Sequence, residues 1–164
     1  MKAKSGFTLV EILIVVVILG ILAAIVIPQF TSASTEAKES ALVSDLQSVR
    51  SQIELYKIHH NDNVPGTQGE TFVVAMTSLT NQDGVVDTSG GTDPAYRFGP
   101  YMREIPINPF NDLNTVSEGA TAIVGQGDDS TGWHVVTSGV DAGLFQANDD
   151  DANPLDATDW HTGY

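Results

Sequence analysis

One acidic residue, Glu11, lies within a run of apolar residues that extends from position 7 to position 30 and holds no other charge. A carboxylate near the interior of a bilayer costs roughly 3 kcal/mol on insertion scales, so a tolerated one usually has a partner. Cleavage of the chain between Gly6 and Phe7 would create a free amine one helical turn before Glu11. The spacing therefore predicts that the carboxylate neutralises this amine, in its own chain or in a neighbouring one.

Residue patterns that support catalysis are absent from the sequence. The chain has no Cys, and its four histidines (positions 59, 60, 134 and 161) show no zinc-binding spacing. It has no Gly-x-Ser-x-Gly motif for a hydrolase nucleophile, and no Walker lysine follows the glycines at 125 and 127. The sequence indicates a protein that is not an enzyme.

Acidic residues are the second chemical feature. Seven Lys and Arg against 21 Asp and Glu give a net charge of −14, and most of the acids lie in residues 61–164. This balance excludes a nucleic-acid-binding protein, which needs a basic surface. Asp149, Asp150 and Asp151 are adjacent, and a calcium ion, which takes six to eight oxygen ligands, would offset their repulsion. The alternative is a solvated acidic turn.

The run that carries Glu11 is predicted to be a membrane-spanning helix. As a helix, residues 7–30 are about 36 Å long, against about 30 Å for the hydrocarbon core of a bilayer. Two lysines in the first six residues favour a cytoplasmic amino terminus. Gly20 and Pro28 should add flexibility, and Pro28 should kink or break the helix. A secretory signal peptide, cut after residues 31–33, and a plain anchor are the alternatives.

Helical periodicity continues through residues 31–60 but becomes amphipathic. One apolar stripe, which we expect to pack against a sheet formed by the rest of the chain, contains Ala33, Ala37, Leu42, Leu46, Val49, Ile53 and Tyr56. Residues 61–164 predict a small globular head. Within the head we expect a short helix over 71–80, an extended proline-rich segment over 98–110, and strands over 122–124, 133–137 and 143–147, the last two paired across a turn.

Several features occur together at the amino terminus: a short basic leader, Gly6 followed by Phe7, the sequence Thr8-Leu9-Val10-Glu11, and a long apolar helix with Gly20 and Pro28. With them the chain resembles type IV pilins and the pseudopilins of type II secretion. The resemblance implies that a prepilin peptidase cleaves after Gly6, that the new Phe7 amine is methylated, and that the chains assemble into a helical filament. In such a filament Glu11 attracts the Phe7 amine of the adjacent subunit, and a segment similar to residues 20–28 can melt.

The head resembles the major pseudopilins of type II secretion over residues 56–79, 101–110 and 137–145. In that family a Ser-Gly-Asp-Gly loop near the carboxyl terminus binds calcium. Carried over residue by residue, the candidate calcium ligands are Ser138 and Asp141, with one or more of Asp149, Asp150 and Asp151. The chain departs from the family pattern at Ala142, which replaces a glycine, and at Asn108-Pro109-Phe110, which replaces Asp-Pro-Trp.

The implied fold is the α+β type IV pilin fold. A long amino-terminal helix, half membrane-spanning and half amphipathic, packs on a small antiparallel sheet with an irregular carboxy-terminal loop. The expected organisation is a cleaved leader (1–6), a transmembrane and filament-core helix (7–30), an amphipathic helix half (31–60) and the head (61–164).

The implied function is that of a structural filament subunit, closest to the major pseudopilin of a type II secretion system. Expected partners are further copies of the chain, the prepilin peptidase and methyltransferase, an inner-membrane assembly platform with its ATPase, and minor pilin-like subunits. The expected locations are the inner membrane before assembly, with the head outside the cytoplasm, and a periplasmic or cell-surface filament afterwards. The alternatives are a subunit of an extended type IV pilus for adhesion, motility or DNA uptake, and a membrane-anchored acidic binding module.

Overall fold

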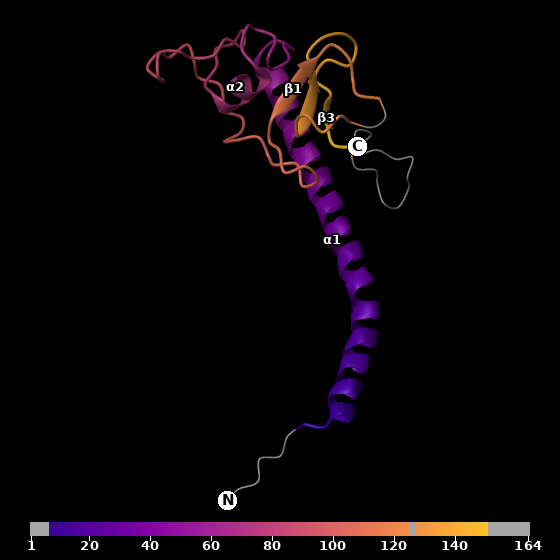
Figure 1. The fold of residues 1–164 in the computed structure, drawn as a ribbon. Coiled ribbons are helices and arrows are strands. Elements are labelled where there is room, and N and C mark those ends of the chain that lie inside the picture. Colours follow the sequence, from indigo (N-terminus) through magenta and orange to yellow (C-terminus); the bar gives the residue numbers. More distant parts are fainter. Residues whose placement is uncertain (1–6, 125–126, 151–164) are drawn as a thin grey trace, which may run out of the picture. The chain divides into compact units, whose positions relative to one another are not determined.

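One long helix dominates the chain. The computed structural model describes residues 7–124 and 127–150. The chain divides into two compact units, residues 1–37 and 38–164, and helix α1 (Leu9–His59) begins in the first and ends in the second (Figure 1). The predicted helix end is confirmed: Asn61 and Asp62 have positive φ values of 55° and 64°. This left-handed backbone ends the helical hydrogen-bond pattern.

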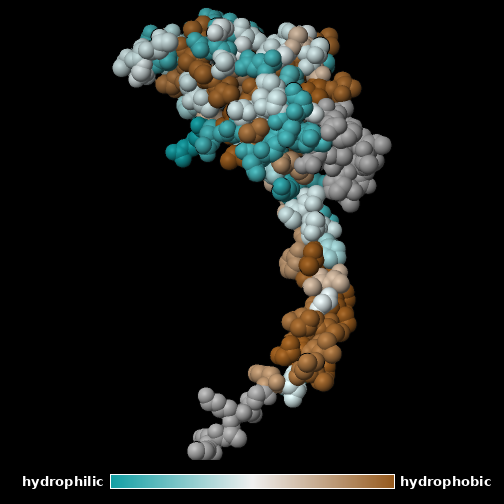
Figure 2. Space-filling model, viewed as in Figure 1, coloured by the Kyte–Doolittle hydropathy of each residue, from teal (hydrophilic) through white to brown (hydrophobic). Residues whose placement is uncertain are grey.

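Between Ile12 and Ile27, in the first unit, α1 is apolar on every side. The large apolar side chains between Phe7 and Phe30 are 40–83% exposed, and Figure 2 shows them as a largely hydrophobic surface. A helix that is apolar all round needs an apolar environment. Among the described residues, α1 is the one helix that is long and apolar enough to cross a membrane.

The helix continues through Pro28, so the break predicted as one outcome at this proline does not occur. Pro28 has no N–H, and the carbonyl of Ala24 therefore loses its helical donor. Just beyond it, the hydroxyls of Thr31, Ser32 and Thr35 donate to carbonyls four residues earlier, at 3.1–3.3 Å. Such bonds slightly destabilise helices and often bend them. This stretch is a local weak point of α1.

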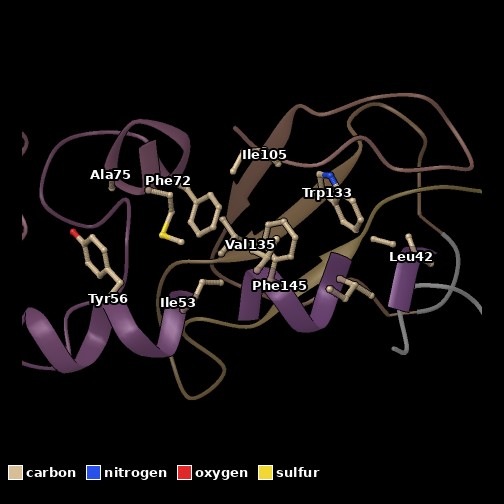
Figure 3. Close-up of a cluster of buried hydrophobic side chains, with 13 residues drawn as sticks. Leu42, Ile53, Tyr56, Phe72, Ala75, Ile105, Trp133, Val135 and Phe145 are labelled. Atoms are coloured by element: carbon tan, nitrogen blue, oxygen red, sulfur yellow. The ribbon is translucent and has the colours of Figure 1, made fainter. Parts of the chain in front are cut away.

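In the second unit, one face of α1 enters the hydrophobic core. Five members of the predicted stripe are buried: Leu42, Leu46, Val49, Ile53 and Tyr56. Ala33 and Ala37 belong to the first unit and are exposed. Figure 3 shows the α1 side chains meeting Phe72 of a second helix together with Trp133, Val135 and Phe145 of the sheet. The Phe145 ring stacks on those of Phe72 and Trp133 at 5.4 and 5.3 Å between centroids.

The second helix, α2 (Phe72–Thr77), lies within the predicted range but is shorter. Thr71 is its N-cap and accepts a hydrogen bond from the Val74 N–H at 3.4 Å. The helix ends early because Ser78 is extended, with φ −117° and ψ 169°. Segment 98–110 contains no strand, as predicted.

The sheet has three short strands, β1 (Val116–Gly119), β2 (Trp133–Val136) and β3 (Phe145–Ala147), in that order. β2 and β3 are antiparallel, with Val135 opposite Phe145, which confirms the predicted hairpin. β1 was not predicted, and it pairs with β2 in parallel. The sheet is therefore mixed, and not wholly antiparallel as predicted, although the α+β class is confirmed.

The strand predicted at residues 122–124 is wrong for a local reason. The backbone of Ile123 does not pair with a strand but with a side chain. Its N–H donates to Gln146 Oε1 at 3.0 Å, and its carbonyl accepts from Gln146 Nε2 at 3.2 Å. A side-chain amide thus replaces the neighbouring strand.

Arg50 of α1 covers the outer edge of β3. Leu144 and Asn148 bond to the β2 side, so the carbonyl of Phe145 points away from β2. Arg50 donates to that carbonyl through Nε at 3.0 Å and Nη2 at 2.8 Å. Partial burial lowers the pKa of the guanidinium, which remains charged at neutral pH.

Candidate functional site

The amino-terminal turn of α1 holds Glu11 in a reciprocal pair of hydrogen bonds. The Thr8 N–H donates to Glu11 Oε2 at 3.5 Å, and the Glu11 N–H donates to Thr8 Oγ1 at 3.2 Å. This arrangement is a capping box, in which two backbone donors of a helix start are satisfied by side chains. The pattern Thr-x-x-Glu is a capping signal that a sequence can reveal, although this cap was not predicted.

The surroundings of Glu11 are apolar and open. Phe7, Leu9 and Val10 are 79%, 83% and 60% exposed, and Glu11 itself is exposed. An amine at Phe7 would place a positive charge at the positive end of the helix dipole, which disfavours it. A carboxylate in the first turn offsets that charge. The geometry therefore suits Glu11 to pair with an amine of its own or another chain.

The remaining residues predicted for processing and flexibility fall in two places. Gly6 lies outside the described residues, and Phe7 directly precedes the helix cap. Gly20 is in the middle of the exposed apolar part of α1, with open space where a Cβ would lie. Pro28 precedes the hydroxyl-rich stretch described above. Helix flexibility at Gly20 and Pro28 stays a prediction.

The candidate calcium ligands are not brought together among the described residues. Ser138 and Asp141 are exposed in the turn between β2 and β3, whereas Asp149 follows β3 at its opposite end. Asp150 is exposed, and Asp151 lies outside the described residues. Residues 7–124 and 127–150 contain no group of three or more His, Asp or Glu side chains that could hold a metal. The described ligands do not fit a single calcium ion, and calcium binding stays a prediction.

Asp149 instead takes part in a buried polar network. Its side chain is 1% exposed, and its Oδ2 accepts a hydrogen bond from Asn108 Nδ2 at 2.8 Å. The same Asn108 amide donates to the Gly132 carbonyl at 2.9 Å. The nearby Asn148 amide joins Asp128 Oδ1 and Thr131 Oγ1, both at 2.8 Å. This network fastens segment 98–110 to the end of β3, and Asn108 was noted in the sequence only as a departure from a family pattern.

Comparisons with known proteins show which family the chain belongs to. Residues 1–27 match the family described as the prokaryotic N-terminal methylation motif. The type II secretion system core protein G of Vibrio cholerae serotype O1 is 31% identical over 120 residues, which cover 73% of this chain and 75% of the relative. The core protein G of Klebsiella pneumoniae is 32% identical over 120 residues, 73% of this chain and 79% of the relative. The chain belongs to the core protein G family of type II secretion.

The family relation extends along most of the chain. The core protein G of Aeromonas hydrophila is 28% identical over 146 residues, which cover 82% of this chain and 95% of the relative. No solved structure matches the chain significantly. Members of the core protein G family are pseudopilins, structural subunits and not enzymes, so both the predicted resemblance and the predicted lack of catalysis are confirmed. The apolar helix and the family together indicate a filament-forming protein anchored in the inner membrane.

Proposed function

We propose that this pseudopilin is the major subunit of a secretion pseudopilus, and that Glu11 drives its assembly. Cleavage between Gly6 and Phe7 exposes the Phe7 amine, which is then methylated, and Glu11 of one subunit pairs with that amine on the next. The observation that carries the proposal is a lone carboxylate, exposed in the first turn of a helix whose other side chains there are apolar and equally exposed. In a bilayer or a filament core such a carboxylate needs a cationic partner.

The proposal also includes the location of the chain and the proteins that act on it. Before assembly the apolar part of α1 lies in the inner membrane and the acidic head lies outside the cytoplasm. A prepilin peptidase and methyltransferase processes the chain, an assembly platform with its ATPase adds subunits, and minor pilin-like subunits complete the filament. The acidic head does not bind nucleic acid in this scheme, because it lacks a basic surface.

The decisive variant is Glu11→Gln, which keeps the size of the side chain and removes its charge. Loss of one partner from a buried ion pair costs about 3–5 kcal/mol. We therefore expect the yield of sheared filaments to fall at least about tenfold, while cleavage at Phe7 continues. Glu104→Gln, which removes an exposed head carboxylate, is the matched control and should assemble as wild type. Normal filament yield from Glu11→Gln would overturn the role of Glu11 in assembly, and absence of filaments from the wild-type chain as well would favour the anchored binding module.

The mature amino terminus is a separate test. The intact mass of the chain from membranes should correspond to a protein that begins at N-methyl-Phe7. A chain that begins near Ser34 would instead identify an ordinary secretory signal and would remove the roles proposed for Phe7 and Glu11.

A further inference from the structure

At the carboxyl end of α1, two adjacent histidines enclose one phenolic oxygen. Tyr101 Oη lies 2.9 Å from His59 Nδ1 and 3.0 Å from His60 Nε2. Thr80 Oγ1 lies 3.1 Å from the same His60 nitrogen. We call these four residues the His–Tyr cluster. It joins α1 to residues 80–101, the segment that contributes both Thr80 and Tyr101.

Burial and a neighbouring carbonyl determine which ring nitrogen of His60 carries the hydrogen. The side chain is 0% exposed, and its ring centroid lies 4.0 Å from that of Tyr56 and 5.4 Å from that of Phe98. Its Nδ1 lies 3.3 Å from the carbonyl of Gln82. A carbonyl only accepts, so Nδ1 carries the hydrogen, and Nε2 of the neutral ring must itself accept one.

The Tyr101 hydroxyl supplies that hydrogen. The Thr80 hydroxyl donates to the Phe98 carbonyl at 3.3 Å, which leaves Tyr101 as the donor to His60 Nε2. The Tyr101 oxygen then accepts from Nδ1–H of His59. Burial raises the pKa of Tyr101 to about 12, so the hydroxyl keeps its hydrogen. His59 is only half-buried, and none of these bonds involves its Nε2, so a hydrogen on that nitrogen leaves them unchanged.

A second proton, on His60 Nε2, conflicts with the same arrangement. The nitrogen becomes a donor that faces the hydroxyl oxygens of Tyr101 and Thr80, and the Tyr101 hydrogen loses its acceptor. The two charged rings would have their centroids 6.5 Å apart. Burial, and secondarily the nearby His59, lower the pKa of His60.

The other charged groups around the cluster only partly offset this conflict. Asp83, in the turn after Thr80, favours the His60 cation, although its influence is smaller than that of burial. Arg97 places its guanidinium 5.5 Å from the centroid of the Phe98 ring, which itself packs on both histidines, and adds positive charge. Tyr56 is uncharged, because burial raises its pKa to about 12.

We propose that the His–Tyr cluster is an acid-sensitive lock between the end of α1 and residues 80–101. The lock is closed when the histidine pair carries no proton charge or one, and it opens when both imidazoles are charged. Opening releases the exposed loop between Thr80 and Phe98, whose two backbone hydrogen bonds, at 2.9 and 3.1 Å, close the base of that loop.

Amide hydrogen exchange on the full chain in detergent micelles tests the lock between pH 8 and pH 4. After correction for intrinsic exchange rates, the amides of Thr80 and Phe98 should exchange at least about tenfold faster in acid, relative to the amide of Val136, which bonds to the Leu144 carbonyl within the sheet. Nitrogen NMR of the imidazoles at pH 8 should show hydrogen on Nδ1 of both His59 and His60.

Two variants separate the lock from general acid instability. His59→Gln leaves His60 as the one imidazole of the cluster, so two charged rings cannot occur together, and the loop amides should remain protected to a lower pH than in wild type. His134→Gln, which changes a histidine of β2 that bonds to Ser117 of β1 and to the Thr121 carbonyl after it, should leave the pH of loop opening unchanged. Loop opening at the same pH in wild type and His59→Gln would overturn the proposal, as would protection of Thr80 and Phe98 that does not change down to pH 4.

Discussion

In the proposed assembly, the Glu11 carboxylate serves two purposes at different times. In the single chain, Glu11 caps the helix by accepting from the Thr8 N–H at 3.5 Å, a long and therefore weak hydrogen bond. A cationic amine is a stronger partner for a carboxylate than a neutral amide. In the proposed filament, the amine of another subunit would therefore replace the Thr8 N–H as the partner of Glu11.

The Thr8 hydroxyl can be tested without touching the charge. Thr8→Val keeps the shape of the side chain and removes the acceptor for the Glu11 N–H. Loss of an N-cap costs about 1 kcal/mol, so the amides of the first turn should exchange about fivefold faster in micelles. Thr31→Val, a change in the same helix far from the cap, should not affect those amides. Equal exchange in Thr8→Val and wild type would show that the capping box does not form.

Asn108 is the residue on which the buried network depends. Asn108→Ala deprives the Asp149 carboxylate and the Gly132 carbonyl of a donor inside the protein. The variant also removes the acceptor of the Phe110 N–H, so three hydrogen bonds are lost, each of which contributes about 0.5–1.5 kcal/mol. Urea denaturation should therefore show a loss of about 2–3 kcal/mol in the free energy of unfolding. Asn114→Ala, at an exposed position, should change it by less than about 0.5 kcal/mol.

At the scale of elements, the sequence predicted those structures whose signal is periodic. The apolar stripe of α1, the short α2 and the hairpin of β2 and β3 follow from spacings of three to four or of two residues. β1 reads Val-Ser-Glu-Gly, which has little strand propensity, and its pairing with β2 in parallel depends on contacts distant in sequence. Gln146, whose amide mimics a strand, and Asn108, whose role needs a partner 41 residues away, have no local signal at all.

The two faces of α1 in the second unit offer a matched stability test. Leu46 is 1% exposed and Leu55 is 39% exposed on the same helix. Leu46→Ala leaves a cavity in the core and should lower the free energy of unfolding by about 2–5 kcal/mol. Leu55→Ala should lower it by about 1 kcal/mol or less. Similar losses in both variants, measured by urea denaturation, would contradict the assignment of the buried face.

At the scale of the whole molecule, the two units have separate sources of stability. In the part of the chain that the structure describes, the hydrophobic core lies between Leu42 and Ala147, within the second unit. The first unit contributes a helix whose apolar side chains remain exposed. Its stability therefore depends on a bilayer or on neighbouring helices, whereas the second unit, residues 38–164, contains its own core.

This division predicts the behaviour of a shortened chain. Residues 38–164 alone should be soluble and should unfold cooperatively, because removal of residues 1–37 takes nothing from the core. Circular dichroism should show a single thermal transition, and gel filtration should show no large aggregates. A chain that stays unfolded would mean that the first part of α1 is needed to form the head.

The contact between Arg50 and Phe145 has a consequence for a crowded array of identical chains. An uncovered strand edge is a template on which another chain can add its own strand, and such growth leads to aggregation. The guanidinium occupies the outward carbonyl in the middle of the edge of β3 with two hydrogen bonds. Copies held at high local concentration are thereby hindered from joining edge to edge at β3.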